Sequence, residues 1–103
     1  MKMRRYHLDP VLRASGFRCA YCGKDLLADS DSLVTVVRDH LVAASAGGPD
    51  GPCNRVASCA ACDRLKGDAV VGTVEEARRI IEGRRLGVEL WRRRIRAAVA
   101  VEA

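Results

Sequence analysis

Aromatic side chains are scarce in this chain of 103 residues. They make up 4% of it, namely Tyr6, Phe17, Tyr21 and Trp91, so Val, Leu, Ile and Ala must supply most of the apolar burial. A chain of this length forms one domain and buries only a modest fraction of its surface. We therefore expect a weak core that needs additional cross-links.

Long apolar runs are lacking as well. No stretch contains the roughly 20 consecutive apolar residues that a membrane span requires. The basic residues near the start are not followed by the apolar segment of a secretory signal peptide. We therefore expect a cytoplasmic protein with no membrane association. In that reducing compartment, paired cysteines bind metal more often than they form disulfides.

Acidic residues are fewer than basic ones, which gives a net charge of +5 and a pI near 9.3. Fifteen of the 18 basic side chains are arginine, whose planar guanidinium binds phosphate better than the lysine ammonium does. This balance favours a polyanionic partner such as nucleic acid. A chain rich in Arg, Ala and Val can also reflect a GC-rich genome, so charge alone does not decide between the two explanations.

Five cysteines are many for a chain of this size. Cys19-x-x-Cys22 and Cys59-x-x-Cys62 form two knuckles separated by thirty-six residues. Each spacing lets both thiolates of a pair reach one tetrahedral Zn²⁺, and such an ion contributes on the order of 10 kcal/mol to folding. The alternatives are two redox dithiols or two disulfides. Cys53 is left over and is interpreted as a small buried residue or a free thiol.

Local signals divide the rest of the chain into short elements. Asp9 and Pro10 begin a helix as its N-cap and first residue, and a β-branched run indicates a strand that ends at Asp39 and His40. Glycines and prolines then predict an open loop without regular structure. The ranges are a helix over 11–15, a strand over 33–38, the loop over 43–52, a strand over 54–57 and a helix over 60–66, ending at Gly67.

The C-terminal third is predicted to be helical. Thr73 and Glu76 form a capping box for a helix over 74–82, and the glycines of 83–87 are expected to separate it from a second amphipathic helix. One continuous helix is the alternative. Its apolar stripe would run through Ala77, Ile81, Val88, Trp91, Ile95 and Ala98.

Several segments together resemble one known family. They are Phe-Arg-Cys-Ala-Tyr-Cys-Gly (17–23), Arg-Asp-His-Leu (38–41), Gly-Gly (47–48), Asn-Arg-Val (54–56) and Cys-Ala-Ala-Cys-Asp-Arg-Leu-Lys-Gly (59–67). This pattern resembles the zinc-knuckle subgroup of the HNH (His-Asn-His) endonucleases. The resemblance implies an α+β fold, a small zinc-stabilised ββα-metal (His-Me finger) unit over about 16–70. A short N-terminal helix precedes it and C-terminal helices over about 73–100 follow, in a single domain.

The resemblance also assigns roles. It makes Asp39 and Asp63 ligands of a catalytic Mg²⁺ or Mn²⁺ and His40 the general base. Asn54 is the residue that orients the loop bearing the histidine. Cys19, Cys22, Cys59 and Cys62 hold the structural zinc. Asp63 stands where the family usually has asparagine or histidine, but a carboxylate is still a hard ligand for these cations. Outside this context Asn54 would be interpreted as a turn residue.

Three basic residues are expected to contact substrate, namely Arg38, Arg64 and Lys66. For Lys66 an ion pair with Asp63, one helical turn away, is the alternative. Eight other arginines cluster in the C-terminal third, and over 75–96 these eight arginines and four glutamates give a local charge of +4. They are expected either to form a solvated helix face or to bind the DNA backbone.

These observations lead to three hypotheses. The first is a metal-dependent endonuclease that hydrolyses DNA phosphodiester bonds, with His40 activating water. The second is a catalytically decayed zinc module that binds nucleic acid or a protein partner, which Asp63 favours. The third is a subunit of a larger assembly, docked through the C-terminal helices and Trp91. The remaining histidine, His7, lies outside every motif and is expected to be a surface residue.

Overall fold

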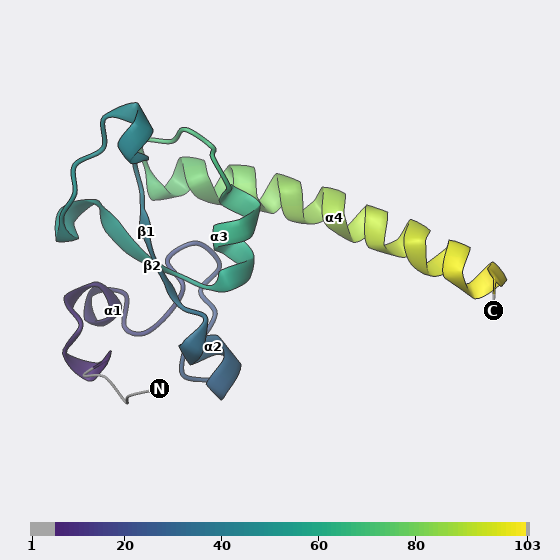
Figure 1. Cartoon of the computed structure of the whole chain (residues 1–103), viewed down its shortest axis with the longest axis horizontal. Helices are drawn as coiled ribbons and strands as arrows, with labels where there is room; N and C mark the ends of the chain where they lie inside the picture. Colours follow the sequence, from purple (N-terminus) through teal and green to yellow (C-terminus); the bar gives the residue numbers. More distant parts are fainter. Residues whose placement is uncertain (1–5, 103) are drawn as a thin grey trace.

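The computed structural model describes residues 6–102, which form a small mixed α/β structure (Figure 1). None of its helices combines the length and apolar character needed to cross a membrane. The helices and strands are α1 (Pro10–Ala14), α2 (Ser30–Val34), β1 (Val37–His40), β2 (Arg55–Ser58), α3 (Ala60–Lys66) and α4 (Val74–Glu102). Short 3-10 helices cover Tyr6–Leu8, Ala44–Ala46 and Pro52–Asn54.

The two strands form one antiparallel pair, in which Val37 lies opposite Ser58 and His40 lies opposite Arg55. His40 is therefore the last residue of β1, and the loop over 41–54 begins directly after it. Cys59 follows β2 at once and caps α3. This succession brings the end of one strand, the start of one helix and a long loop to the same part of the molecule (Figure 1).

The predicted N-terminal helix is confirmed, with Pro10 at its first position as expected and its last residue, Ala14, one position earlier than expected. Asp9 is its N-cap, and its Oδ1 accepts hydrogen bonds from the amides of Val11 and Leu12 at 3.0 and 3.1 Å. Pro10 occupies the first helical position, where its missing amide hydrogen has no cost. The cap orients the helix so that Val11 and Leu12 are buried in the core.

The predicted strand over 33–38 is wrong in its first half. Leu33 belongs to α2, which Asp29 caps by accepting a hydrogen bond from the Ser32 amide at 2.7 Å. The cap lies outside the β-branched run, and its hydrogen bond outweighs the weak strand preference of the residues that follow. Only Val37 to His40 pair with the second strand.

The second half of the unit lies close to its predicted position. The second strand is shifted by one residue, to Arg55–Ser58, and α3 has the predicted bounds with Gly67 as its C-cap. The loop contains two short 3-10 helices, where no regular structure was expected. At Gly48 a Cβ atom would lie 1.9 Å from the Val42 carbonyl oxygen, so this close approach requires glycine.

The expected interruption at 83–87 is wrong, because α4 is a single helix of 29 residues. Each interior glycine costs about 1 kcal/mol relative to alanine, which the strong helix formers around it offset. The capping box is half confirmed. Thr73 Oγ1 accepts from the Glu76 amide at 3.1 Å, but the Glu76 carboxylate accepts from Gly72 rather than from Thr73.

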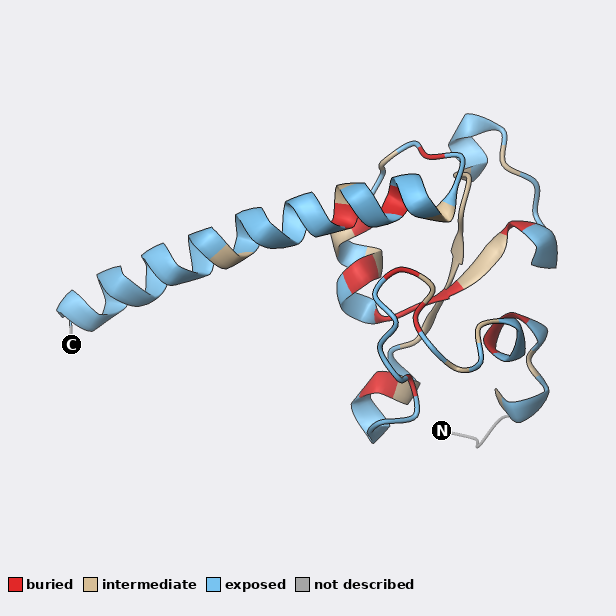
Figure 2. Cartoon of the chain, turned by 180° about the vertical axis from the view of Figure 1, so that it is seen from behind, coloured by how far each residue is buried: buried red, intermediate tan, exposed pale blue. Residues whose placement is uncertain are grey.

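The core lies between α1, the sheet, α3 and the first turns of α4. Its fully buried side chains include Leu12, Leu26 and Cys62. From α4 only Ala77 and Ile81 are buried, and the rest of this helix extends away from the sheet, so the molecule measures 50 × 33 × 21 Å (Figure 2). The structure thus consists of a packed unit and a helix that projects from it.

Candidate functional site

The four paired cysteines lie together, as their spacing predicts. Their Sγ atoms are all within 4.8 Å of one another, and Cys22 Sγ lies 3.7 Å from Cys59 Sγ. Four thiolates at this separation repel one another, and a tetrahedral Zn²⁺ is the cation whose geometry suits four sulfur ligands. Cys53 lies outside this cluster and is exposed, which excludes its interpretation as a buried residue.

The surroundings of the cluster favour ionised sulfur. Burial raises the pKa of the Cys19 thiol, but hydrogen bonds from the backbone of Cys59, Cys22 and Tyr21 outweigh burial and lower this pKa to about 7. The Cys62 amide also donates to Cys59 Sγ, at 3.4 Å. Because thiolates are the form that binds zinc, these contacts fit a structural zinc site.

Three arginines of α4 attach this helix to the cluster and to α3. Arg85 donates to Cys62 Sγ at 3.3 Å, Arg78 makes two hydrogen bonds to the Ala20 carbonyl, and Arg84 binds the last carbonyl groups of α3. These side chains thus bind the protein itself, which differs from both the solvated face and the DNA contact expected for them. A guanidinium beside zinc-bound thiolates would also balance their charge.

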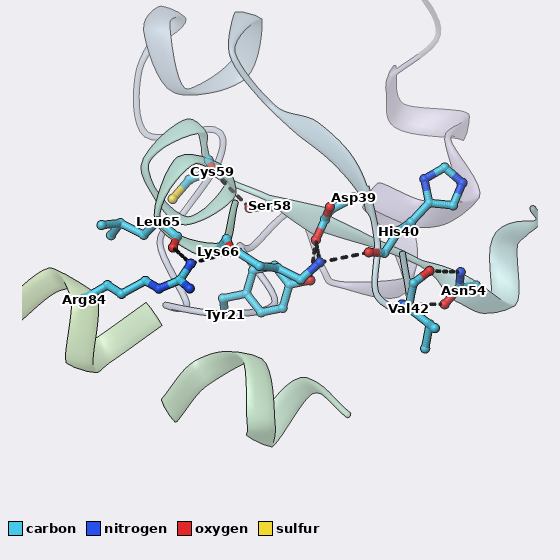
Figure 3. A network of polar contacts seen from close by, with 10 residues as sticks. All are labelled: Tyr21, Asp39, His40, Val42, Asn54, Ser58, Cys59, Leu65, Lys66 and Arg84. Atoms are coloured by element: carbon cyan, nitrogen blue, oxygen red, sulfur yellow. Dashed lines mark hydrogen bonds and ion pairs between the residues drawn. The ribbon is translucent and has the colours of Figure 1, made fainter. Parts of the chain in front are cut away.

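Asp39 is held by two residues on the α3 side of β1 (Figure 3). Its Oδ2 accepts a hydrogen bond from the Tyr21 hydroxyl at 2.6 Å and pairs with the Lys66 ammonium at 2.8 Å. Lys66 is only 3% exposed and also donates to the His40 carbonyl at 2.9 Å. A buried ammonium requires such partners, so Lys66 pairs with Asp39 rather than with Asp63 or an exposed phosphate.

Asp63 lies in the first turn of α3. Burial and the negative charge of Asp39 raise the pKa of Asp63, while Lys66 opposes this shift. The two carboxylates are therefore close enough to influence each other. Their oxygens suit Mg²⁺ or Mn²⁺, and the Lys66 ammonium already supplies one positive charge to the pair.

His40 faces a different direction from Asp39. Its imidazole Nε2 lies 3.2 Å from Asp50 Oδ1, and Figure 3 shows the ring pointing away from the Asp39 carboxylate. This is the alternation expected for neighbours in a strand. Asp50 also accepts a hydrogen bond from Arg55 at 2.7 Å. Hydrogen bonds to both residues lower the pKa of Asp50, with that from Arg55 the larger cause.

Asn54 connects the two ends of the loop that follows His40. Its side-chain oxygen accepts from the Val42 amide at 2.9 Å, and its side-chain nitrogen donates to the carbonyls of Val42 and Pro49 at 2.9 and 2.8 Å. The side chain is buried, so these bonds are shielded from water. Asn54 thus fixes the loop as one unit.

The other two predicted substrate-binding residues lie elsewhere. Arg38 pairs with Asp9 Oδ2 at 2.5 Å, and its guanidinium lies 5.8 Å from the centre of the Tyr6 ring. Arg64 is exposed and lines a groove between α3 and α4. The structure therefore brings neither of them into the group around Asp39.

Three residues that contact the site were not identified in the sequence. Tyr21 lies inside the first knuckle, and its place between two metal-binding cysteines was a signal that this aromatic side chain is fixed near the site. Asp50 contacts His40 from the loop that follows β1. Arg85 contacts Cys62 from α4, which is distant in the chain. No local pattern distinguishes either of them from other charged residues.

Comparisons of the chain with models of known families, with curated proteins and with solved structures found no match.

Proposed function

We propose that this protein is a metal-dependent endonuclease of the HNH type that hydrolyses DNA, with a ββα-metal unit formed by β1, β2 and α3. The main support is the buried Asn54 side chain, whose three hydrogen bonds fix the loop directly after His40. This is the role that the resemblance assigns to the asparagine. The nearby carboxylates of Asp39 and Asp63 are the second support.

In this proposal His40 accepts a proton from the attacking water. An imidazole is suited to this task near neutral pH, and a positioned general base contributes typically about 10² to 10⁴ in rate. His40 Nε2 lies 3.2 Å from Asp50 Oδ1, and the reaction uses the tautomer in which Nε2 donates to Asp50 and the lone pair of Nδ1 is left for the water. The fixed loop keeps Asp50 and His40 on the same side of β1.

Asp39 and Asp63 would hold the divalent cation, with Tyr21 and Lys66 fixing the orientation of Asp39. When bound, Mg²⁺ or Mn²⁺ neutralises the charge that develops on the phosphate and the leaving oxygen. The DNA itself is attracted by the net positive charge of the chain.

One observation favours a second candidate, a catalytically inactive zinc module that binds nucleic acid or a protein. The Lys66 ammonium lies on the Asp39 carboxylate, and both side chains are largely buried. A cation is therefore already present at one of the two proposed ligands. If Lys66 cannot be displaced and the remaining oxygens do not suffice, no divalent metal would bind.

Incubation of the protein with supercoiled plasmid separates the two candidates. With Mg²⁺ or Mn²⁺ we expect conversion to nicked or linear DNA, and with a chelator no conversion. His40→Ala should lower the rate by at least about 100-fold while keeping the zinc, because four cysteines already complete that site. His7→Ala is the matched control, since His7 is exposed and lies outside every motif of the site.

Two further results would change the assignment. Plasmid that stays supercoiled with every metal, in a preparation with full zinc content, would favour the inactive module. Asp63→Ala should lower cleavage strongly, whereas Asp63→Asn, which restores the usual family residue, should retain it within about an order of magnitude. Equal cleavage by Asp63→Ala and the parent would mean that position 63 does not bind the catalytic metal.

A further inference from the structure

One set of exposed apolar residues on the projecting part of α4 forms a stripe, while Leu86, Leu90 and Val101 are exposed on other sides of the helix. The members of the stripe are spaced three or four residues apart, so they lie on one face of the helix. They are Val88, Trp91, Ile95 and Val99, and all are exposed, Trp91 by 64%. No element among residues 6–102 packs over this stripe (Figure 2).

The stripe continues into the groove between α3 and α4. This groove has a volume of about 490 Å³, and Leu65, Val88 and Trp91 form its apolar lining. Because Val88 and Trp91 belong to both, groove and stripe form one surface, which we name the α4 groove. Its apolar side chains on α4 follow the spacing that pairs one helix with another.

The border of the α4 groove is basic. Arg64 and Arg85 flank it at α3, and Arg92 and Arg96 flank it farther along α4. Residues 84–102 contain six arginines and two glutamates, a net charge of +4. An occupant with acidic side chains on both sides of an apolar stripe would complement this surface.

We propose that the α4 groove binds an acidic amphipathic helix of a protein partner. A second copy of α4 would bring a like charge of +4 against the first. DNA phosphates would match the arginines but would leave Val88, Ile95 and Val99 without apolar contacts. The α4 groove is separate from the proposed catalytic group, since it lies on α4 and the adjacent side of α3 and includes none of His40, Asp39 and Asp63.

Trp91 allows a direct test, because it is the only tryptophan of the chain. The probe is a synthetic peptide of about four heptads with leucines at the core positions and glutamates at the flanking positions. Titrated into the zinc-loaded chain of 103 residues, it should shift the Trp91 emission to shorter wavelength in a saturable way. Added salt should weaken the binding.

Two variants of α4 provide the matched comparison. Ile95→Asp places a negative charge within the stripe and should weaken peptide binding by about tenfold or more. Leu90→Asp introduces the same charge on the opposite side of the helix, at a residue of similar exposure (50% against 47%). It should change the affinity for the peptide by less than about twofold. Circular dichroism checks that both variants keep their helix.

Several results would overturn the proposal. Equal binding of a peptide with lysines in place of the glutamates would contradict the charge argument, and absence of binding would contradict the surface itself. A blue shift of the protein alone with rising concentration, together with a dimer in sedimentation, would assign the groove to a second copy. A short DNA duplex whose effect on Trp91 is lost in Ile95→Asp would assign it to nucleic acid.

Discussion

The two halves of α4 differ in their surroundings more than in their sequence. Both carry apolar residues at helical spacing among arginines and glutamates, but Ile81 is 2% exposed and Ile95 is 47% exposed. The first half packs beside α3 and the cysteine cluster, whereas the second half extends beyond both (Figure 1). The amphipathic pattern therefore identifies the apolar face of α4. The packed unit, which contains the four clustered cysteines, determines which part of that face is buried.

The arginines show the same difference. In the first half, Arg78, Arg84 and Arg85 bind Ala20, the end of α3 and Cys62. In the second half, Arg92 and Arg93 pair with Glu89 on the same helix. Such exposed pairs within one helix contribute little to stability. The first half is thus attached to the fold, whereas the hydrogen bonds and ion pairs of the second half, among residues 6–102, lie within its own helix.

The largest effect is expected from removing one of the four clustered cysteines, beside which the first half of α4 packs. Cys62→Ser should abolish zinc binding and unfold the packed unit, because the metal contributes on the order of 10 kcal/mol to a core that is small. Zinc content by metal analysis and far-ultraviolet circular dichroism measure the two effects. Cys53→Ser is the control and should keep both the zinc and the fold, since Cys53 is exposed. Equal damage from the two substitutions, or parental protein without zinc, would contradict the assignment.

An intermediate effect should separate the two halves of α4 directly. Ile81→Ala should lower the free energy of unfolding by about 2 to 4 kcal/mol, because it removes a buried side chain and leaves a cavity. Ile95→Ala removes the same atoms from an exposed position and should change the free energy of unfolding by less than about 0.5 kcal/mol. Urea denaturation of both variants makes the comparison. A large loss from Ile95→Ala would mean that the distal half is covered in solution, for example by another copy of the chain.

The smallest effect concerns the glycines of α4. A Cβ at Gly83 or Gly87 would meet nothing within 4 Å, so alanine is accommodated at both positions. Gly83→Ala, within the attached half, should raise the free energy of unfolding by up to about 1 kcal/mol. Gly87→Ala should raise helicity by circular dichroism while leaving the unfolding midpoint nearly unchanged. A loss of stability in Gly83→Ala would indicate that the helix is interrupted there after all.

Local signals in the sequence were sufficient for several elements. Asp9 and Pro10 define the start of α1, and Cys59 and Gly67 bound α3, because caps act on amides only a few residues away. The paired spacing of the cysteines likewise determined that four thiols meet, since each pair is short enough to reach one ion. The position of Asp39 and His40 at the end of a strand followed from the loop signals that come after them.

Other features depend on residues that are distant in the chain and were decided only by the tertiary structure. The partner of Lys66 is Asp39, across twenty-six residues, and not the nearer Asp63. Arg85 reaches Cys62, and Ile81 is buried where Ile95 is not, because of what lies opposite each of them. A sequence pattern specifies which side chains need a partner. Which partner each one finds depends on how the zinc-site cysteines, the sheet and α4 are arranged in space, since burial and charge pairing act between groups that only folding brings together.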